Sequence, residues 1–341
     1  MSLPVMMAPM AGASPAQLAI AVGNAGGMGA CGALLMNPDS IAAWVQEVRS
    51  KTNGAFQLNT WIPDPAPQRD LDNEAKLCEF LSHWGPFVSP EAANAPLLDF
   101  NAQCDAMLAA GPRVISSIMG LYPAQFVKRM KDAGVHWFAT VTTVEEALQA
   151  QDAGADVLVV QGMEAGGHRG AFQSELAEQN MVGLFSLLPA VVDVARVPVV
   201  ATGGISDARA IAAALTLGAS AVQIGTGLLR SDESDTPAVL ADEFARTRPE
   251  QTVATRAFSG RLGRSIRSSY TEAAHAKAAP QPAPYPIQRA LTAGMRKQAL
   301  NTSNLETMQA WAGQSAALAQ TGPASSIVTN LWDEAAALLP R

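Results

Sequence analysis

The chain's strongest signal for chemistry is a loop at residues 161–170, with the sequence QGMEAGGHRG. It carries Glu164, His168 and Arg169 among four glycines, and it follows the apolar run 156–160, which is typical of a buried β-strand. Glycine lets the backbone come close to a ligand, and histidine changes its charge near neutral pH. The pattern predicts a catalytic loop at the C-terminal end of a strand, next to a bound cofactor.

His168 stands apart from the other histidines of the chain, which are His83, His136 and His275. None of those three lies on a glycine-rich loop at a strand end, so each is expected to be structural. We predict that His168 is catalytic, either as a general base or as a hydrogen-bond donor to an anionic substrate. For Glu164 and Arg169 two roles stay open: a part in the chemistry, or orientation of the loop by ion pairing.

Two more glycine-rich loops follow later apolar runs, at residues 201–205 (ATGGI) and 223–227 (QIGTG). In barrel enzymes the loops after the seventh and eighth strands commonly bind phosphate through backbone N–H groups. Gly204 and Gly225 would let a phosphate approach closely, and Thr226 adds a hydroxyl. A tight turn between strand and helix is the simpler explanation of one such loop, but two of them at this pair of strands favour a phosphate site.

The type of phosphorylated cofactor follows from which side chains lie at strand ends. Pyridoxal phosphate and Schiff-base aldolase chemistry need a lysine there. The lysines are Lys51, Lys76, Lys128, Lys131, Lys277 and Lys297, and none lies at such a position. Flavin mononucleotide (FMN) needs a phosphate site, hydrogen-bonding partners for the ring edge and a flat apolar slot. Residues 9–12 (PMAG), Asn59 and Gln161 supply these elements.

Eight short apolar runs precede residue 230 and predict strands, at residues 5–8, 29–33, 56–59, 114–118, 137–141, 157–160, 197–201 and 221–224. Helical patterns lie between several of them, including residues 16–24, 72–81, 144–151 and 207–217. Repeated strand–helix units predict an α/β fold, a (β/α)₈ TIM barrel with its site at the C-terminal ends of the strands. A doubly wound open sheet is the alternative, but it has one ligand site at a topological switch, whereas glycine-rich or polar loops here follow several strands.

The division of the chain follows from where the strand pattern stops. We predict an FMN-binding barrel from residues 1–230 plus 308–341, and a smaller, mainly helical domain at residues 231–307 that covers one side of the barrel mouth. Residues 60–112 read as a helix with an elaboration. Ser14 and Pro15 predict an N-cap and a first helical residue. The GxGxxG pattern at residues 27–32 follows a helix and enters a strand, so it is read as a turn and not as a dinucleotide fingerprint.

Composition excludes several classes of protein. The 341 residues are 48% hydrophobic and 16% charged, with a net charge of −7, which argues against nucleic acid or an anionic membrane surface as a partner. The cysteines Cys31, Cys78 and Cys104 form no CxxC pair, so no metal site or disulfide framework is expected. Without a signal peptide or a membrane-spanning run, a cytoplasmic location is expected. Whether the chain forms a homodimer is left open.

Several of these stretches together resemble the nitronate monooxygenase family, formerly called 2-nitropropane dioxygenases. They are residues 7–12, 24–29, 161–170, 201–205, 223–226, 259–264 (SGRLGR) and 311–315 (WAGQS). The resemblance covers essentially the whole chain, and the EAGGHRG run is its most specific part. It implies an FMN-containing barrel with a smaller inserted domain, which oxidises alkyl nitronates with O₂ to a carbonyl compound and nitrite.

By position, the resemblance implies that His168 is the catalytic histidine. The residues expected at the cofactor are Pro9, Met10, Ala11, Asn59, Gln161, Gly166, Gly167, Gly203, Gly204, Gln223, Ile224, Gly225 and Thr226. The expected partners are a nitronate or nitroalkane substrate and O₂. The same superfamily includes NAD(P)H-dependent FMN reductases of quinones or enoyl thioesters, and Arg169 after the histidine favours the nitronate enzyme over these. A non-catalytic flavin binder is a third alternative, which the placement of His168 disfavours.

Overall fold

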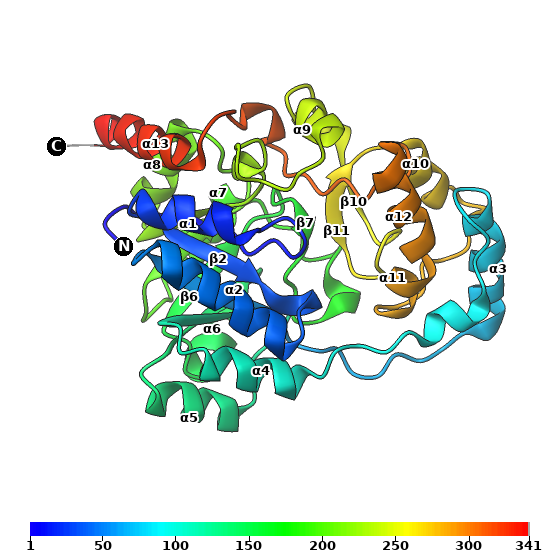
Figure 1. Ribbon diagram of the computed structural model, residues 1–341, viewed down its shortest axis with the longest axis horizontal. Helices are drawn as coiled ribbons and strands as arrows, with labels where there is room; N and C mark the ends of the chain where they lie inside the picture. Colours follow the sequence, from blue (N-terminus) through cyan, green and yellow to red (C-terminus); the bar gives the residue numbers. More distant parts are fainter. Residues whose placement is uncertain (340–341) are drawn as a thin grey trace.

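Eight parallel strands close into a barrel in a computed structural model that describes residues 1–339 (Figure 1). They are β1 (Val5–Met7), β2 (Met28–Gly32), β3 (Ala55–Trp61), β4 (Val114–Ile118), β5 (His136–Val141), β6 (Val157–Gln161), β8 (Val199–Thr202) and β9 (Ala221–Ile224). The ring closes where β9 pairs with β1. All eight predicted strands are confirmed, with ends displaced by two residues at most, and so is the (β/α)₈ barrel.

Side-chain alternation along the strands decides which residues face the barrel interior. In β6, Leu158 and Val160 belong to the core between strands and helices, whereas Val159 belongs to a small cluster inside the barrel. The next inward position is Gln161. The same period puts Val222 and Ile224 of β9 in the outer core and turns Gln223 inward. The strands therefore deliver polar side chains to the barrel's C-terminal mouth and apolar ones below it.

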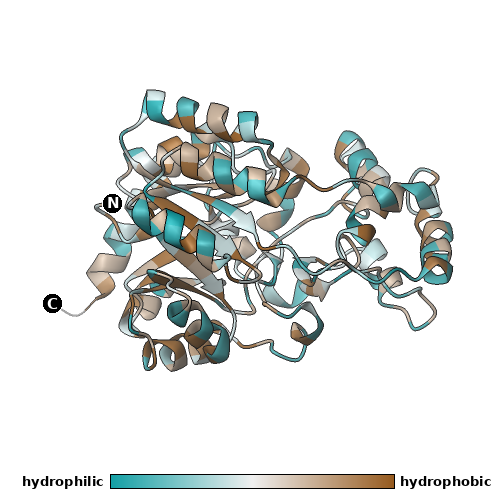
Figure 2. Ribbon diagram, turned by 90° about the horizontal axis from the view of Figure 1, so that it is seen from below, coloured by the Kyte–Doolittle hydropathy of each residue, from teal (hydrophilic) through white to brown (hydrophobic). Residues whose placement is uncertain are grey.

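Helices surround the strands and bury their apolar faces against them. They are α1 (Ala16–Asn24), α2 (Pro38–Lys51), α4 (Phe100–Ala109), α5 (Ala124–Asp132), α6 (Val144–Asp152), α7 (Leu184–Val192), α8 (Ala208–Thr216) and α13 (Ala324–Leu338). Figure 2 shows both hydrophilic and hydrophobic residues on these helices, around strands that are largely hydrophobic. The C-terminal helix α13 packs against α8 and α1, as expected for a tail that returns to the barrel. No helix in residues 1–339 is both long and apolar enough to cross a bilayer.

A second, smaller core lies to one side of the barrel (Figure 1). Its helices are α3 (Leu71–Ser82), α10 (Ser269–Ala274), α11 (Ile287–Leu291) and α12 (Ala293–Thr302); α9 (Ala238–Phe244) lies on the same connection. Leu77 and Leu81 of α3 share this core with Phe258, Tyr270 and Leu291. The elaboration after β3 thus packs with the segment that follows the barrel. The division into residues 1–230 plus 308–341 and residues 231–307 stays a prediction.

Two short strands lie within the predicted helical segment and were not expected. β10 (Thr252–Thr255) pairs with β11 (Gly263–Ile266), and β11 pairs in turn with β7 (Gly167–His168). This three-stranded sheet links the histidine loop to the chain after the barrel. Short 3₁₀ helices complete the fold at Ala33–Leu35, Pro90–Asn94, Ser174–Leu176, Thr226–Leu228, Pro249–Gln251 and Ala316–Leu318.

The predicted N-cap of α1 is wrong by one residue. Pro15 is the N-cap, and the Ser14 side chain makes no bond to the helix. The Ser14 hydroxyl instead accepts from the Met10 N–H and donates to the Met10 carbonyl, both at 2.8 Å. A serine just before a helix is a common N-cap, but here the backbone groups nearest to the Ser14 hydroxyl are those of Met10, in the loop after β1. It therefore shapes the loop that carries Met10.

Candidate active site

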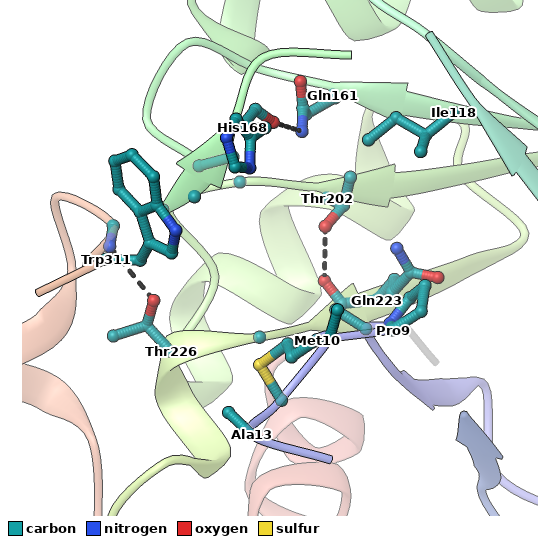
Figure 3. Close-up of a pocket in the computed structure, with 18 of the residues that line it drawn as sticks. Pro9, Met10, Ala13, Ile118, Gln161, His168, Thr202, Gln223, Thr226 and Trp311 are labelled. Atoms are coloured by element: carbon teal, nitrogen blue, oxygen red, sulfur yellow. Dashed lines mark hydrogen bonds between the residues drawn. The ribbon is translucent and has the colours of Figure 1, made fainter. Parts of the chain in front are cut away.

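A cavity of about 270 Å³ opens at the C-terminal ends of the strands. With one exception, the residues predicted for the site line it: His168, Pro9, Met10, Ala11, Asn59, Gln161, Gly166, Gly167, Gly203, Gly204, Gln223, Gly225 and Thr226. The exception is Ile224, which is fully buried between barrel and helices because it points outward from β9. Figure 3 shows how loops far apart in the chain converge here.

Glycines form a cradle at one end of this cavity. Gly203 and Gly204 have φ of +107° and +69°, a backbone conformation that glycine adopts without strain. The Gly204 N–H has no hydrogen-bond partner within residues 1–339. The cradle is tied to the loop after β11 and α12, since the Ser315 hydroxyl donates to the Gly204 carbonyl at 2.7 Å and the Gly313 N–H donates to Thr226 Oγ1 at 3.0 Å. A free N–H in a concave glycine backbone suits a phosphate.

Amides of β3 and β9 form a polar wall across the cavity. The Gln57 amide donates to Gln223 Oε1 at 3.1 Å, so the amide nitrogen of Gln223 is left to donate elsewhere. Asn59 donates to the Ser116 hydroxyl at 3.0 Å, which leaves its oxygen as an acceptor. Gln57 Oε1 is buried without a partner. Of these residues Asn59 and Gln223 line the cavity, and they offer an acceptor and a donor to a planar, hydrogen-bonding ring edge.

Gln161 contributes to the site chiefly by holding the histidine loop. Its amide nitrogen donates to the His168 carbonyl at 3.0 Å, and its oxygen accepts from the Gly170 N–H at 2.8 Å (Figure 3). One side chain at the end of β6 therefore binds the far end of the loop at two points, on either side of Arg169. This bidentate contact explains why a glutamine precedes the glycine-rich run.

The His168 imidazole lies between two tryptophans. Its centroid is 4.5 Å from Trp61 and 4.8 Å from Trp311, each in an edge-to-face arrangement. Nε2 is 2.8 Å from the Ser259 hydroxyl. The residue itself belongs to β7 and pairs with Gly263 of β11. Packing on two faces and a hydrogen bond at one nitrogen hold the ring in a single orientation at the cavity wall.

The charges around His168 are positive. Burial, and then Arg261, Arg289 and Arg296, lower the pKa of His168 to about 3, so the imidazole is neutral at physiological pH. Arg289 and Arg296 also line the cavity, and neither forms an ion pair within the described chain. Burial and the neighbouring Arg289 lower the pKa of Arg296 to about 10. The site is therefore a neutral imidazole in a cavity that favours anions.

Arg169 and Glu164 orient the loop, but not by pairing with each other. Arg169 is only 6% exposed and donates to the carbonyls of Gln161 (2.6 Å), Thr142 (3.1 Å) and Asn180 (3.1 Å). The Glu164 carboxylate accepts from the Leu184 N–H at 2.9 Å. Neither side chain forms an ion pair within residues 1–339, because nearby backbone groups supply partners for both charges.

Several residues at the site were not predicted as such from the sequence. They are Trp61, Ser259, Arg289, Arg296 and Trp311. Arg289 and Arg296 are seven residues apart, a spacing that puts them on one face of a helical segment. The sequence therefore indicates that the two arginines lie together. Ser259 and Trp311 lie in stretches quoted for the family resemblance, but nothing in their local pattern indicates contact with His168.

Comparisons with known proteins agree along the whole chain. A family described as nitronate monooxygenase matches residues 1–334. A probable nitronate monooxygenase from Staphylococcus aureus strain MSSA476 is 35% identical over 338 residues, covering 97% of this chain and 94% of that protein. Among solved structures, a nitroalkane oxidase from Streptomyces ansochromogenes has a TM-score of 0.87 at 33% identity, covering 98% of this chain and 96% of its own. FabK from Thermotoga maritima has a TM-score of 0.76 at 27% identity, with coverages of 99% and 94%.

Proposed function

Because the chain belongs to the nitronate monooxygenase family of oxidoreductases, we propose that it uses FMN and O₂ to oxidise alkyl nitronates to a carbonyl compound and nitrite. The observation that carries the proposal is the neutral imidazole of His168 at the wall of a positively charged cavity. A nitronate is a small anion, and such a cavity attracts it. The likeness to a nitroalkane oxidase supports the same chemistry.

The residues at the cavity fit FMN at both of its ends. Gly204 and Thr226 would bind the phosphate, and Asn59 and Gln223 would meet the polar edge of the ring. Met10 borders the apolar part of the cavity. Bound there, FMN would supply the redox chemistry, which is the transfer of electrons from the substrate to O₂.

The protein's own side chains would bind and orient the substrate. Arg289 and Arg296 would attract the anionic oxygens, while Trp61 and Trp311 shield His168 from water. His168 would take the α-proton of a neutral nitroalkane or, once protonated beside a bound anion, donate to a nitronate oxygen. An imidazole with a pKa near 3 is a weak base, so we expect the ionised nitronate to be the better substrate.

The test compares ethyl nitronate with nitroethane as substrates and measures nitrite release. We expect released FMN from the purified protein and a higher kcat/KM with the nitronate. In His168→Gln, turnover of nitroethane should fall about a hundredfold or more, with bound flavin retained. His136→Gln is the matched control, because the His136 side chain is 66% exposed and outside the cavity. Protein that binds no flavin, or releases no nitrite from either substrate, would contradict the proposal.

A NAD(P)H-dependent FMN reductase is the second candidate. The uncompensated Arg289 and Arg296 would also suit the phosphates of a dinucleotide. Anaerobic mixing of the FMN-loaded protein with NADH or NADPH separates the two. Rapid bleaching of the flavin would favour the reductase, whereas bleaching by ethyl nitronate alone supports the nitronate enzyme.

A further inference from the structure

We propose that Ser259 is a positioning residue that holds His168 in the tautomer with its proton on Nε2. Nδ1 is then the atom that exchanges a proton with the substrate. The role of that proton in turnover rests on the function proposed above, but the position of the proton in the resting protein does not.

The assignment follows from the single proton of the Ser259 hydroxyl. Ser259 Oγ lies 3.1 Å from the carbonyl oxygen of Arg261 and 2.8 Å from Nε2 of His168. A carbonyl can only accept, and no other group within residues 1–339 donates to this one. Ser259 is fully buried, so water does not satisfy it. The hydroxyl proton therefore goes to Arg261, and the hydroxyl oxygen accepts from an Nε2–H.

The loop that carries Ser259 is held on both sides. The N–H groups of Ser259 and Gly260 both donate to the Arg256 carbonyl, at 3.2 and 2.8 Å. Gly260 has a φ of +85°, and a Cβ there would lie 2.3 Å from the Ala283 carbonyl oxygen. The Arg261 guanidinium is 2% exposed and binds the Asp64 carboxylate and the Ala171 carbonyl. The acceptor of the Ser259 proton cannot readily move away.

The other ring nitrogen is left for the ligand. Nδ1 of His168 has no hydrogen-bond partner within the described residues and is not among the buried unpaired atoms. The residue lines the cavity, and the edges of Trp61 and Trp311 oppose a flip of the ring. The charged groups that act on it are Arg261, Arg289 and Arg296, and the Asp64 carboxylate pairs with Arg261 and not with the ring. A serine is a neutral partner, so it orients the ring without stabilising the imidazolium that a carboxylate would favour.

Nitrogen NMR reads the tautomer directly. The FMN-loaded protein is labelled with ¹⁵N-histidine, and the His168 signals are identified by their loss in His168→Gln. At about pH 7 we expect a protonated Nε2 and an unprotonated Nδ1. In Ser259→Ala no hydroxyl selects one tautomer, so both nitrogens should move towards the intermediate shifts of an exchanging pair, and Ser259→Thr should restore the original pair. A wild type with its proton on Nδ1, or a Ser259→Ala variant with unchanged shifts, overturns the proposal.

Ser265→Ala is the matched control for the loss of a buried hydroxyl. The Ser265 side chain is also fully buried and donates to a carbonyl, that of Ala310 at 2.9 Å, but it does not touch His168. The His168 shifts should be unchanged in this variant, and a change equal to that in Ser259→Ala overturns the specific role of Ser259.

Kinetics supply the second readout. We expect Ser259→Ala to lower kcat for nitroethane about tenfold, less than the roughly hundredfold or more that loss of the general base itself costs, with KM changed less and both restored in Ser259→Thr. Loss of kcat without any change of tautomer overturns the proposal. A wild type that turns over no nitro compound removes the proposed function, while the NMR result still decides the role of Ser259.

Discussion

His168 is kept neutral by arginines and burial, not by a partner that titrates with it. Burial disfavours the imidazolium, as do Arg261, Arg289 and Arg296, and the tryptophans packed against the ring exclude water. An anion bound in the cavity would offset part of this charge and raise the pKa of the histidine. The residue is thereby most basic when the negatively charged substrate is present. We therefore expect consequences in the pH dependence of both catalysis and stability.

The first prediction concerns the pH profile. Because the pKa of His168 lies near 3 and that of a free histidine near 6.5, its neutral form persists throughout the range in which an exposed histidine titrates. We expect kcat/KM for preformed ethyl nitronate to show no acidic limb from this group between pH 8 and about pH 5. Stopped-flow turnover in wild type and His168→Gln measures it. A limb near pH 6.5 that disappears in the variant would show that the free enzyme's histidine titrates normally.

The lowered pKa of His168 also makes the stability of the folded protein depend on pH. As pH falls below about 6.5 the unfolded chain takes up a proton on His168 that the folded chain refuses until about pH 3. The folded state therefore loses stability across this window relative to neutral pH. Urea denaturation of wild type and His168→Gln at pH 7 and pH 5 should show a smaller acid loss in the variant.

The second prediction concerns Arg289, which lines the cavity without an ion-pair partner in the described chain. Replacing it by methionine keeps much of the side-chain volume and removes one charge that attracts the substrate. We expect kcat/KM for ethyl nitronate to fall about tenfold, or ~1.4 kcal/mol, and its dependence on salt to weaken. The control is Arg129→Met, whose side chain is 47% exposed on α5. Equal effects of the two changes would mean that Arg289 acts only through net charge.

Among the elements, the barrel strands and the loops at the barrel's mouth could be predicted from the sequence. Strands such as β4 and β9 are short apolar runs between turn residues, and their boundaries follow from local pattern. A loop that continues a predicted strand, like that of His168, is then placed by topology alone. The pairing of β7 with β11 was not predictable in this way, because two residues of extended chain leave no periodicity to read.

Residues brought in by the second core were missed for the same reason. Ser259 reaches His168 across 91 positions of the chain, and Trp311 lies in a segment that pairs with β11 only through an isolated bridge to Ser265. Their contacts depend on how the second core docks on the barrel, which no local propensity encodes. The family resemblance marked both stretches, but it assigned them no contact.

The third prediction tests Arg169 as the tie between strand ends. Its guanidinium joins the carbonyls of Thr142 after β5, Gln161 at the end of β6 and Asn180 in the following loop. Arg169→Met leaves buried carbonyls unpaired, and we expect a loss of about 3 kcal/mol in the free energy of unfolding. Urea denaturation measures it, with Arg196→Met as the control, because the Arg196 side chain is 66% exposed. A loss no larger than that of the control would show that water replaces the guanidinium.

At the scale of the whole molecule, the cavity's lining is drawn from the barrel and from the second core beside it (Figure 1). The barrel contributes the glycine cradle and the polar wall, and the segment after it contributes Arg289, Arg296 and the support of His168. Catalytic geometry therefore depends on how firmly the two cores are joined. The bridge between Asp64 and Arg261 is one such joint, because Asp64 leaves the barrel after β3 and Arg261 precedes β11.

The last prediction concerns the removal of this ion pair. The Arg261 side chain is 2% exposed and that of Asp64 is 24% exposed, so Asp64→Asn leaves a buried guanidinium without its counter-charge. Removing one partner of a fully buried ion pair costs about 3–5 kcal/mol in the free energy of unfolding. Because Asp64 is partly exposed, we expect a loss of about 2 kcal/mol. Asp105→Asn is the control, since its bridge to Arg129 is exposed on both sides.

Asp64→Asn should also loosen the support of His168, because the Arg261 carbonyl is the acceptor for Ser259. We expect kcat for nitroethane to fall together with stability, and the fluorescence of Trp61 to change before the barrel unfolds. Far-UV circular dichroism follows the barrel in the same titration. If Asp64→Asn and Asp105→Asn unfold at the same urea concentration, the bridge does not join the cores, and the orientation of His168 must then come from the β7–β11 pairing and the tryptophans alone.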